Sequence, residues 1–313
     1  MQRWAGQLVQ DLGYAVRSFR RSPAFTLVAL LSLTLGIGAT SAIFSVIYGV
    51  LIAPYPYAKP EEIWAPQARA VDGRGGHAYT PDEVRQMAAL PAFSDVMATS
   101  IESVLLTGEF SPESFGGVLL TGNAFNFLGV PPVAGRTIQP SDVRSDGGSE
   151  PVVVLSHRLW LRLFQGRADA VGRSLRLNDR PHTIVGVMPP RFGWYGNEGF
   201  WLPLSLTRQD VPWVAPIARL APGVSKEAAE EQLRAFHQRL AQETPAAFPA
   251  QGFTTALRNY LDVTVASGEM RTSLQLLIGA VAFLLLIACA NVANLQLARG
   301  TARAREMAVR MSI

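Results

Sequence analysis

Two long stretches without a single charged side chain constrain this 313-residue chain more than any other feature. The first lies between Arg21 and Lys59, and the second lies between Arg271 and Arg299. Both are longer than the roughly 20 apolar residues that a helix needs to cross the hydrocarbon core of a bilayer. We therefore predict two membrane-spanning helices, at residues 23–53 and 271–298, with a large polar region between them.

The arginines beside the two stretches predict an orientation. Each flank holds four arginines and one acidic residue, so each carries a positive net charge. Because short segments rich in arginine stay in the cytoplasm, we expect both termini there and residues 54–270 in the periplasm, outside the inner (plasma) membrane of a bacterial cell. The sequence pI of about 9.5 then reflects topology. Membrane lipid is the expected partner and nucleic acid is not, since a nucleic-acid binder needs a basic stripe on a soluble face.

Residues 1–22 predict an amphipathic helix. Its apolar residues recur at three- and four-residue spacing, at Trp4, Leu8, Leu12, Ala15 and Phe19. Such a helix lies along the cytoplasmic face of a membrane with its arginines among the lipid headgroups. Packing against another part of the protein explains the same pattern equally well.

Small and polar residues within the spans predict helix packing. Ser32, Gly36 and Thr40 recur at every fourth position of the first span, and such spacing lets two helices approach closely in lipid. We predict that this face contacts a partner helix, for example in a dimer. Asn291 and Asn294 lie near the inner end of the second span, where they either bind a neighbouring helix or lie at headgroup depth.

Residues 54–270 predict a mixed α/β domain of the α+β class, since helices and strands recur without regular βαβ alternation. Thr80 to Glu83 has the pattern of a capping box with proline at the first helical position. Val152–Leu155 reads as a buried strand that precedes a helix from His157, and Ser225 caps a later amphipathic helix. Further strands are predicted at residues 103–106, 117–121, 174–177 and 182–187, the last two forming a hairpin around Asn178-Asp179.

The sequence contains no recognisable catalytic motif. Its only two lysines, Lys59 and Lys226, lie outside any glycine-rich phosphate loop, and neither H-E-x-x-H nor G-x-S-x-G occurs. The four histidines are far apart in sequence and could share a metal only if folding gathered them: His77, His157, His182 and His237. We therefore expect no enzyme activity, no catalytic residue, no cofactor and no metal. The single cysteine, Cys289, cannot form an intrachain disulfide.

Several segments, taken in order along the chain, resemble in sequence the corresponding segments of one protein family. They are Arg17–Thr26, Leu35–Ala39, Ala42–Val46, Leu106–Gly108, Thr121–Phe125, Val152–Trp160, Ile184–Val187, Leu286–Ala298 and Arg305–Arg310. Together they resemble the MacB/FtsX-type ABC transporter permeases, with a MacB-like periplasmic core domain. Within that family the chain is most similar to the acidobacterial-type duplicated orphan permeases.

The resemblance implies a mechanical function, called mechanotransmission. In such permeases a separate cytoplasmic ATPase binds ATP, and the spans carry its motion to the periplasmic domain during export. Residues 299–313 would begin a cytoplasmic coupling helix, with contacts to the ATPase at Arg303, Arg305, Glu306 and Arg310. Family members continue into further spans, so the resemblance implies that the chain is C-terminally truncated. A homodimer or a second permease half is then the expected partner in the membrane.

A second reading belongs to another class. Two spans around an external domain also describe a membrane-anchored extracytoplasmic sensor or binding module. A receptor of that kind needs a long cytoplasmic signalling segment after the second span, and only residues 299–313 follow it here. The permease is therefore the favoured reading.

Overall fold

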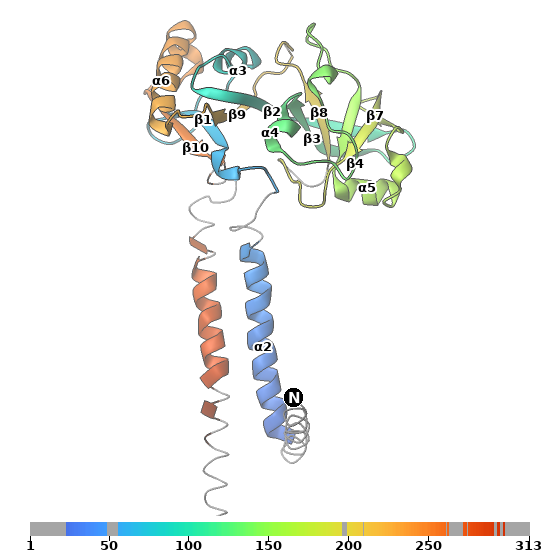
Figure 1. Cartoon of the computed structure of the whole chain (residues 1–313), viewed down its shortest axis with the longest axis vertical. Coiled ribbons are helices and arrows are strands. Elements are labelled where there is room, and N and C mark those ends of the chain that lie inside the picture. The colour runs from blue at the N-terminus through green and yellow to red at the C-terminus, as the bar shows by residue number, and fades with distance from the viewer. Residues whose placement is uncertain are drawn as a thin grey trace, which may run out of the picture. The chain divides into compact units, whose positions relative to one another are not determined.

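A computed structural model describes residues 23–48, 56–195, 199–208, 210–260, 262, 272–273, 275–290, 293–294 and 297. The chain divides into two compact units. One unit comprises Met1–Pro54 and Ala266–Ile313, and the other comprises Tyr55–Val265. The first contains two apolar helices, and the second contains every strand of the described residues (Figure 1).

The helical unit contains α2, Pro23–Ile47. Proline is well tolerated at its first position, because the first N–H groups of a helix have no partner within the helix. Within α2, Thr26–Ser45 is long and apolar enough to cross a membrane, and no other described helix meets both criteria. The apolar helix Gln275–Ala290 is shorter. The described residues thus contain one helix of membrane length, and a second span remains a proposal. The predicted helix over residues 1–22 and the coupling segment 299–313 lie outside the described residues.

The other unit is built on a ten-stranded sheet with the order β10-β1-β9-β2-β3-β8-β5-β7-β4, while β6 pairs with both β2 and β7. The strands are β1 Trp64–Ala70, β2 Phe93–Thr107, β3 Glu113–Thr121, β4 Ala134–Gly135, β5 Val152–Leu155, β6 Ser174–Leu177, β7 Arg180–Val187, β8 Phe200–Leu204, β9 Ala215–Leu220 and β10 Phe253–Asn259. The helices are α3 Pro81–Met87, α4 Ala124–Leu128, α5 His157–Phe164 and α6 Lys226–Glu243. The pairs β3–β8 and β5–β7 are parallel, and the others are antiparallel.

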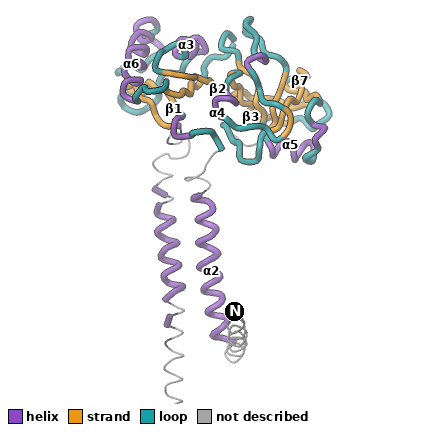
Figure 2. The backbone as a smooth tube through the Cα atoms, viewed as in Figure 1, coloured by secondary structure: helices purple, strands orange, loops and turns teal. Residues whose placement is uncertain are grey.

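The double pairing of β6 closes part of the sheet on itself. The path β2-β3-β8-β5-β7 returns to β2 through β6, which pairs with β7 along its length and with β2 at Leu106 and Thr107. The remaining strands β9, β1 and β10 form an open arm. Buried residues of α6, among them Leu233 and Phe236, pack on this arm together with Leu257 of β10. Figure 2 shows α3 and α6 on the β1 side and α5 on the β7 side.

Several local predictions are confirmed. The amide of Glu83 donates to Thr80 Oγ1, and the amide of Thr80 donates to Glu83 Oε2 at 2.8 Å, which completes the predicted capping box. Ser225 caps α6, and the predicted strand and helix at β5 and α5 are present. The predicted strands at 103–106 and 117–121 are parts of the longer β2 and β3. Strands β1, β4, β8, β9 and β10 were not predicted.

Candidate functional site

The chain enters and leaves the strand-containing unit at neighbouring points. β1 and β10 pair in antiparallel fashion, with Trp64 opposite Asn259. Beyond that pair, the amide of Tyr260 donates to the carbonyl of Ile63 at 2.9 Å, and Asn259 Nδ2 donates to the carbonyl of Glu61 at 2.8 Å. In sequence, α2 precedes β1 and the second apolar helix follows β10. We call residues 57–63 and 259–260 the junction.

An aromatic cluster holds the two halves of the junction together. The buried ring of Trp194 stacks on Tyr260, with centroids 4.4 Å apart and planes 13° apart. The ring of Tyr57 packs in T-shaped arrangements with Trp194 and Phe192, with ring centroids 5.5 Å and 5.8 Å apart. Tyr57 belongs to the incoming segment and Tyr260 to the outgoing one, so one packed cluster fixes both. Trp201 Nε1 donates to the carbonyl of Trp194 at 3.2 Å, which ties the cluster to β8.

Arg219 on β9 fastens the incoming segment to the domain. Its guanidinium donates to the carbonyls of Ala58, of Lys59 at 3.2 Å and of Phe127 at 3.1 Å. It also lies 4.9 Å from the centroid of the Phe127 ring, within the range of a cation–π interaction. Gly129 ends α4 with φ of 66°, and a Cβ there would lie 2.5 Å from the Cβ of Ala58. Only glycine therefore allows the incoming segment to lie this close to α4.

A buried polar network lies elsewhere in the same unit, between α3, α6 and β10. His77 Nε2 lies 2.9 Å from Glu83 Oε2, and His77 Nδ1 lies 3.0 Å from the carbonyl oxygen of Ala247. The hydroxyl of Tyr79 lies 2.8 Å from His237 Nε2. Folding thus gathers two of the four histidines around one tyrosine. Among the described residues, no three histidine, cysteine or acidic side chains are placed to hold a metal.

The two histidines have opposite pKa shifts. Burial lowers the pKa of His77, but its hydrogen bonds to Glu83 and to the carbonyl of Ala247 outweigh burial and raise the pKa above 6.5. A carbonyl oxygen can only accept, and Glu83 Oε2 also accepts from the amide of Thr80, so the geometry favours an imidazolium–carboxylate pair. Burial and the nearby charge of His77 lower the pKa of His237 to about 4. His237 is therefore neutral near pH 7.

The residues predicted to pack helices differ in how deeply they are buried and in what they contact. Gly36 is buried, and a Cβ on it would lie 3.1 Å from the Cβ of Ala288 on the second apolar helix. Thr40 Oγ1 donates to the carbonyl of Gly36 at 2.7 Å. Ser32 is half-buried and Asn294 is exposed. Asn291 and the coupling candidates Arg303, Arg305, Glu306 and Arg310 lie outside the described residues.

The contact at Gly36 gives a prediction. Gly36→Leu is expected to weaken pairing between α2 and the second apolar helix by about 1–3 kcal/mol, because the added side chain meets Ala288 in a packed contact. A membrane two-hybrid reporter that detects pairing between the two helices measures the effect. Gly38→Leu is the matched control, since a Cβ at Gly38 meets nothing within 4 Å. Equal signals from the two variants would contradict this packing.

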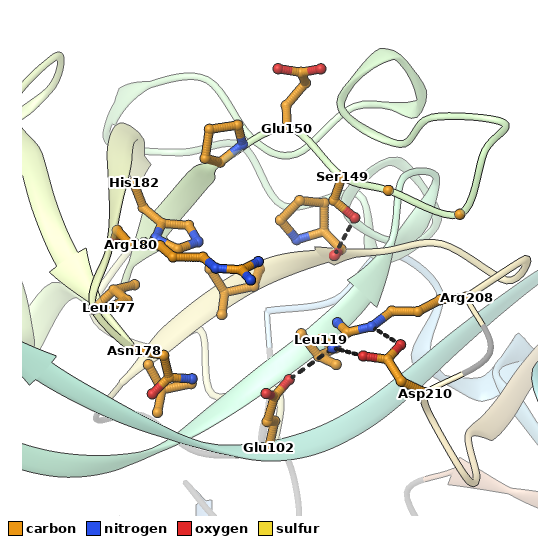
Figure 3. Close-up of a pocket in the computed structure, with 16 residues that line it drawn as sticks. Glu102, Leu119, Ser149, Glu150, Leu177, Asn178, Arg180, His182, Arg208 and Asp210 are labelled. Carbon is orange, nitrogen blue, oxygen red and sulfur yellow. Dashed lines mark hydrogen bonds and ion pairs between the residues drawn. The ribbon is translucent and has the colours of Figure 1, made fainter.

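A cavity of about 560 Å³ opens within the ring of strands (Figure 3). Its floor includes Val104 of β2, Leu119 of β3 and Leu202 of β8. Polar side chains lie around it, including Arg180 and His182 of β7, and burial lowers the pKa of His182. No sequence motif indicated this cavity, since its lining comes from segments that are far apart along the chain.

Comparison with known proteins places most of the chain in one domain family. Residues 26–236 match the family model described as the MacB-like periplasmic core domain. The macrolide export ATP-binding/permease protein MacB of Salmonella paratyphi A is 27% identical over 203 residues, which covers 62% of this chain and 29% of that protein. The protein of the same name from Hahella chejuensis is 26% identical over 200 residues, covering 60% and 28%. The chain therefore spans less than a third of the length of these relatives.

A solved structure shares the fold. The crystal structure of the periplasmic region of MacB from Actinobacillus actinomycetemcomitans aligns with a TM-score of 0.51 at 15% identity. The alignment covers 73% of this chain and 98% of that one.

Proposed function

The chain belongs to the family of proteins with a MacB-like periplasmic core domain, and on that premise we propose that it is a permease component of an ABC-type export system. Its role is mechanical. The apolar helices transmit the motion of a cytoplasmic ATPase to the domain in the periplasm. The family match favours this reading over a two-span sensor or binding module.

The junction is the observation that carries this proposal. Motion of a membrane helix reaches a domain only if the connection between them is stiff. Here the incoming segment is held by Arg219 and by Tyr57, and the outgoing segment is held by Tyr260 on Trp194. Both connections also extend the β1–β10 pair. The points where the chain enters and leaves the domain are therefore anchored in a packed core.

The proposal also includes the membrane orientation of the chain, its ATP-binding partner and its assembly in the membrane. Both termini lie in the cytoplasm, and the ATP is bound by a separate subunit, so this chain itself catalyses no reaction and holds no cofactor. Arg303, Arg305, Glu306 and Arg310 contact that subunit. A second copy of the chain or another permease half completes the assembly in the membrane, through helix faces that include Ser32, Gly36, Thr40, Asn291 and Asn294.

The proposal is tested by reconstitution. The full chain, purified in detergent from membranes of its source bacterium, is expected to retain an ATP-binding subunit, whose ATP hydrolysis in liposomes rises when the chain is present. Arg305→Glu reverses a charge at the proposed contact and should reduce hydrolysis to the rate of the subunit alone. Arg74→Glu, at an exposed position of the domain, is the control. Hydrolysis that is independent of the chain would contradict the proposed function.

A further inference from the structure

One edge of β2 is occupied at both ends and vacant in between. β9 pairs with this edge from Phe93 to Thr99, and β6 pairs with it at Leu106 and Thr107. The residues between them span about 17 Å at the rise of an antiparallel strand. Both neighbours run antiparallel to β2. The vacancy therefore has the length and direction of one short strand.

The backbone groups at the vacancy point outward. The amide of Leu105 donates to Asn178 Oδ1 and its carbonyl accepts from the amide of Asn178, each at 2.8 Å, so odd-numbered residues of this segment face the β6 edge. The amide of Ala98 instead donates to Thr121 on β3. By this alternation, Ile101 and Ser103 direct their N–H and C=O groups toward the vacant edge. Within the described residues, neither forms a backbone hydrogen bond there.

The two faces beside the vacancy differ in character. On one face lies the cavity, and Figure 3 shows Arg180 reaching across it from β7. On the opposite wall Arg208 pairs with Asp210 and with Glu102, the latter at 3.9 Å. None of the ion pairs among the described residues includes Arg180. On the other face, the side chains of Ile101 and Leu105 are 48% and 41% exposed.

We propose that this vacancy binds an extended segment of a partner polypeptide, which adds as a strand antiparallel to β2. Strand addition takes its affinity from main-chain hydrogen bonds and its specificity from alternate side chains. Here one side chain of the bound segment enters the cavity toward Arg180, and its two neighbours lie opposite Ile101 and Ser103. The chemistry selects an acidic residue flanked by apolar ones. This inference goes beyond the proposed function and does not depend on it.

The test uses the full chain in detergent and the capped peptide Ac-Thr-Val-Glu-Val-Thr-NH2. Its Glu faces the cavity and its two Val residues lie opposite Ile101 and Ser103, so the Val amides point at β2 and the Glu amide points away. We expect saturable binding by isothermal titration calorimetry. Hydrogen–deuterium exchange at the amides of Ile101 and Ser103 should slow when the peptide binds.

Matched probes separate backbone pairing from simple filling of the cavity. N-methylation of both Val amides removes the donors to β2 and should weaken binding at least about tenfold, whereas N-methylation of the Glu amide should be tolerated. Replacing Glu by Gln in the peptide should weaken binding about tenfold, since a charge-assisted hydrogen bond is lost. In Arg180→Gln the Glu and Gln peptides should bind alike.

Three outcomes would overturn the proposal. The first is no binding at millimolar peptide. The second is equal affinity for the Val-methylated and Glu-methylated peptides, and the third is binding that leaves exchange at Ile101 and Ser103 unchanged. Arg180 is an exposed residue, so the Arg180→Gln variant is expected to fold normally.

Discussion

Replacing Trp194 by alanine is expected to lower the free energy of unfolding of the domain by about 3–5 kcal/mol, the usual cost of truncating a buried tryptophan. The ring is fully buried and stacks on Tyr260, so its removal leaves a cavity beneath the junction. In a domain of this size, such a loss corresponds to a fall of roughly 10 °C in the Tm. The effect should be largest at the junction itself.

Urea denaturation of the full chain in detergent, followed by circular dichroism, measures the loss. Hydrogen exchange adds a local readout, because the amide of Tyr260, which donates to Ile63 in the native protein, should lose protection. Trp213→Ala is the control, since that ring is 42% exposed and should cost far less. Equal destabilisation by the two substitutions would show that the aromatic cluster does not hold the junction.

The free energy of unfolding of the domain is expected to be largest near pH 6.5, because of the network of His77, Glu83 and His237. The folded pKa of His77 is raised above 6.5, so its stabilisation is present below pH 6.5 and is lost as the pH rises through the folded value. The folded pKa of His237 is lowered to about 4, so its stabilisation is present above pH 6.5 and falls between pH 6.5 and about 4.

The acid side of this profile has a second contributor. Burial raises the pKa of Glu83, but hydrogen bonds from His77 and Thr80 outweigh burial and leave the pKa below 4.5. Its stabilisation is therefore present above pH 4.5 and is lost as the pH falls through the lowered value. The shift of His237 alone amounts to about 3 kcal/mol between pH 6.5 and 4. Urea midpoints measured from pH 4 to 9 reveal the maximum.

Substitutions test which residues cause the acid and the alkaline slopes of the stability–pH profile. Glu83→Gln should cost about 1–3 kcal/mol at pH 6, because it removes the charge-assisted hydrogen bond to His77, and it should flatten the alkaline side. His237→Gln should flatten the acid side between pH 6.5 and 4. Asp82→Asn, at an exposed carboxylate one residue away, should cost less than about 1 kcal/mol. A profile that keeps both slopes in Glu83→Gln would refute the assignment to His77.

Short-range sequence patterns were sufficient to predict many of the helix starts and a hairpin turn. Thr80, Ser156 and Ser225 each accept a hydrogen bond from the start of a helix, which short-range patterns indicate well. Asn178 and Asp179 have positive φ angles of 48° and 61°, as the predicted hairpin turn requires. In each case the residues that decide the structure lie within a few positions of one another.

Three of the strands that were missed, β1, β8 and β9, contain prolines, which argue against a strand interior. The structure shows why two of them are tolerated. Pro66 of β1 lies opposite Leu257, whose amide donates to Glu230 and not to β1. Pro216 of β9 lies opposite Ala98, whose amide donates to Thr121. Both prolines therefore occupy pairs in which no ladder hydrogen bond is lost, and only the register of the sheet reveals this.

The junction and the polar network could not be predicted, because they depend on long-range contacts. Arg219 reaches a carbonyl 161 residues away in the sequence, and Tyr79 reaches His237 across 158 residues. No spacing rule relates such positions.

The antiparallel pairing of β1 with β10 also determines how the domain responds to force. Trp64 and Asn259 are the ends of the two strands closest in sequence to the apolar helices. A force that pulls these two strand ends apart laterally would therefore load the β1–β10 ladder one hydrogen-bonded pair at a time. A common displacement along the strand axis would leave the rungs unstrained and move both strands as one lever. Under the proposed function, we therefore expect the domain to follow concerted displacements of the two strand ends and to yield when they are pulled apart.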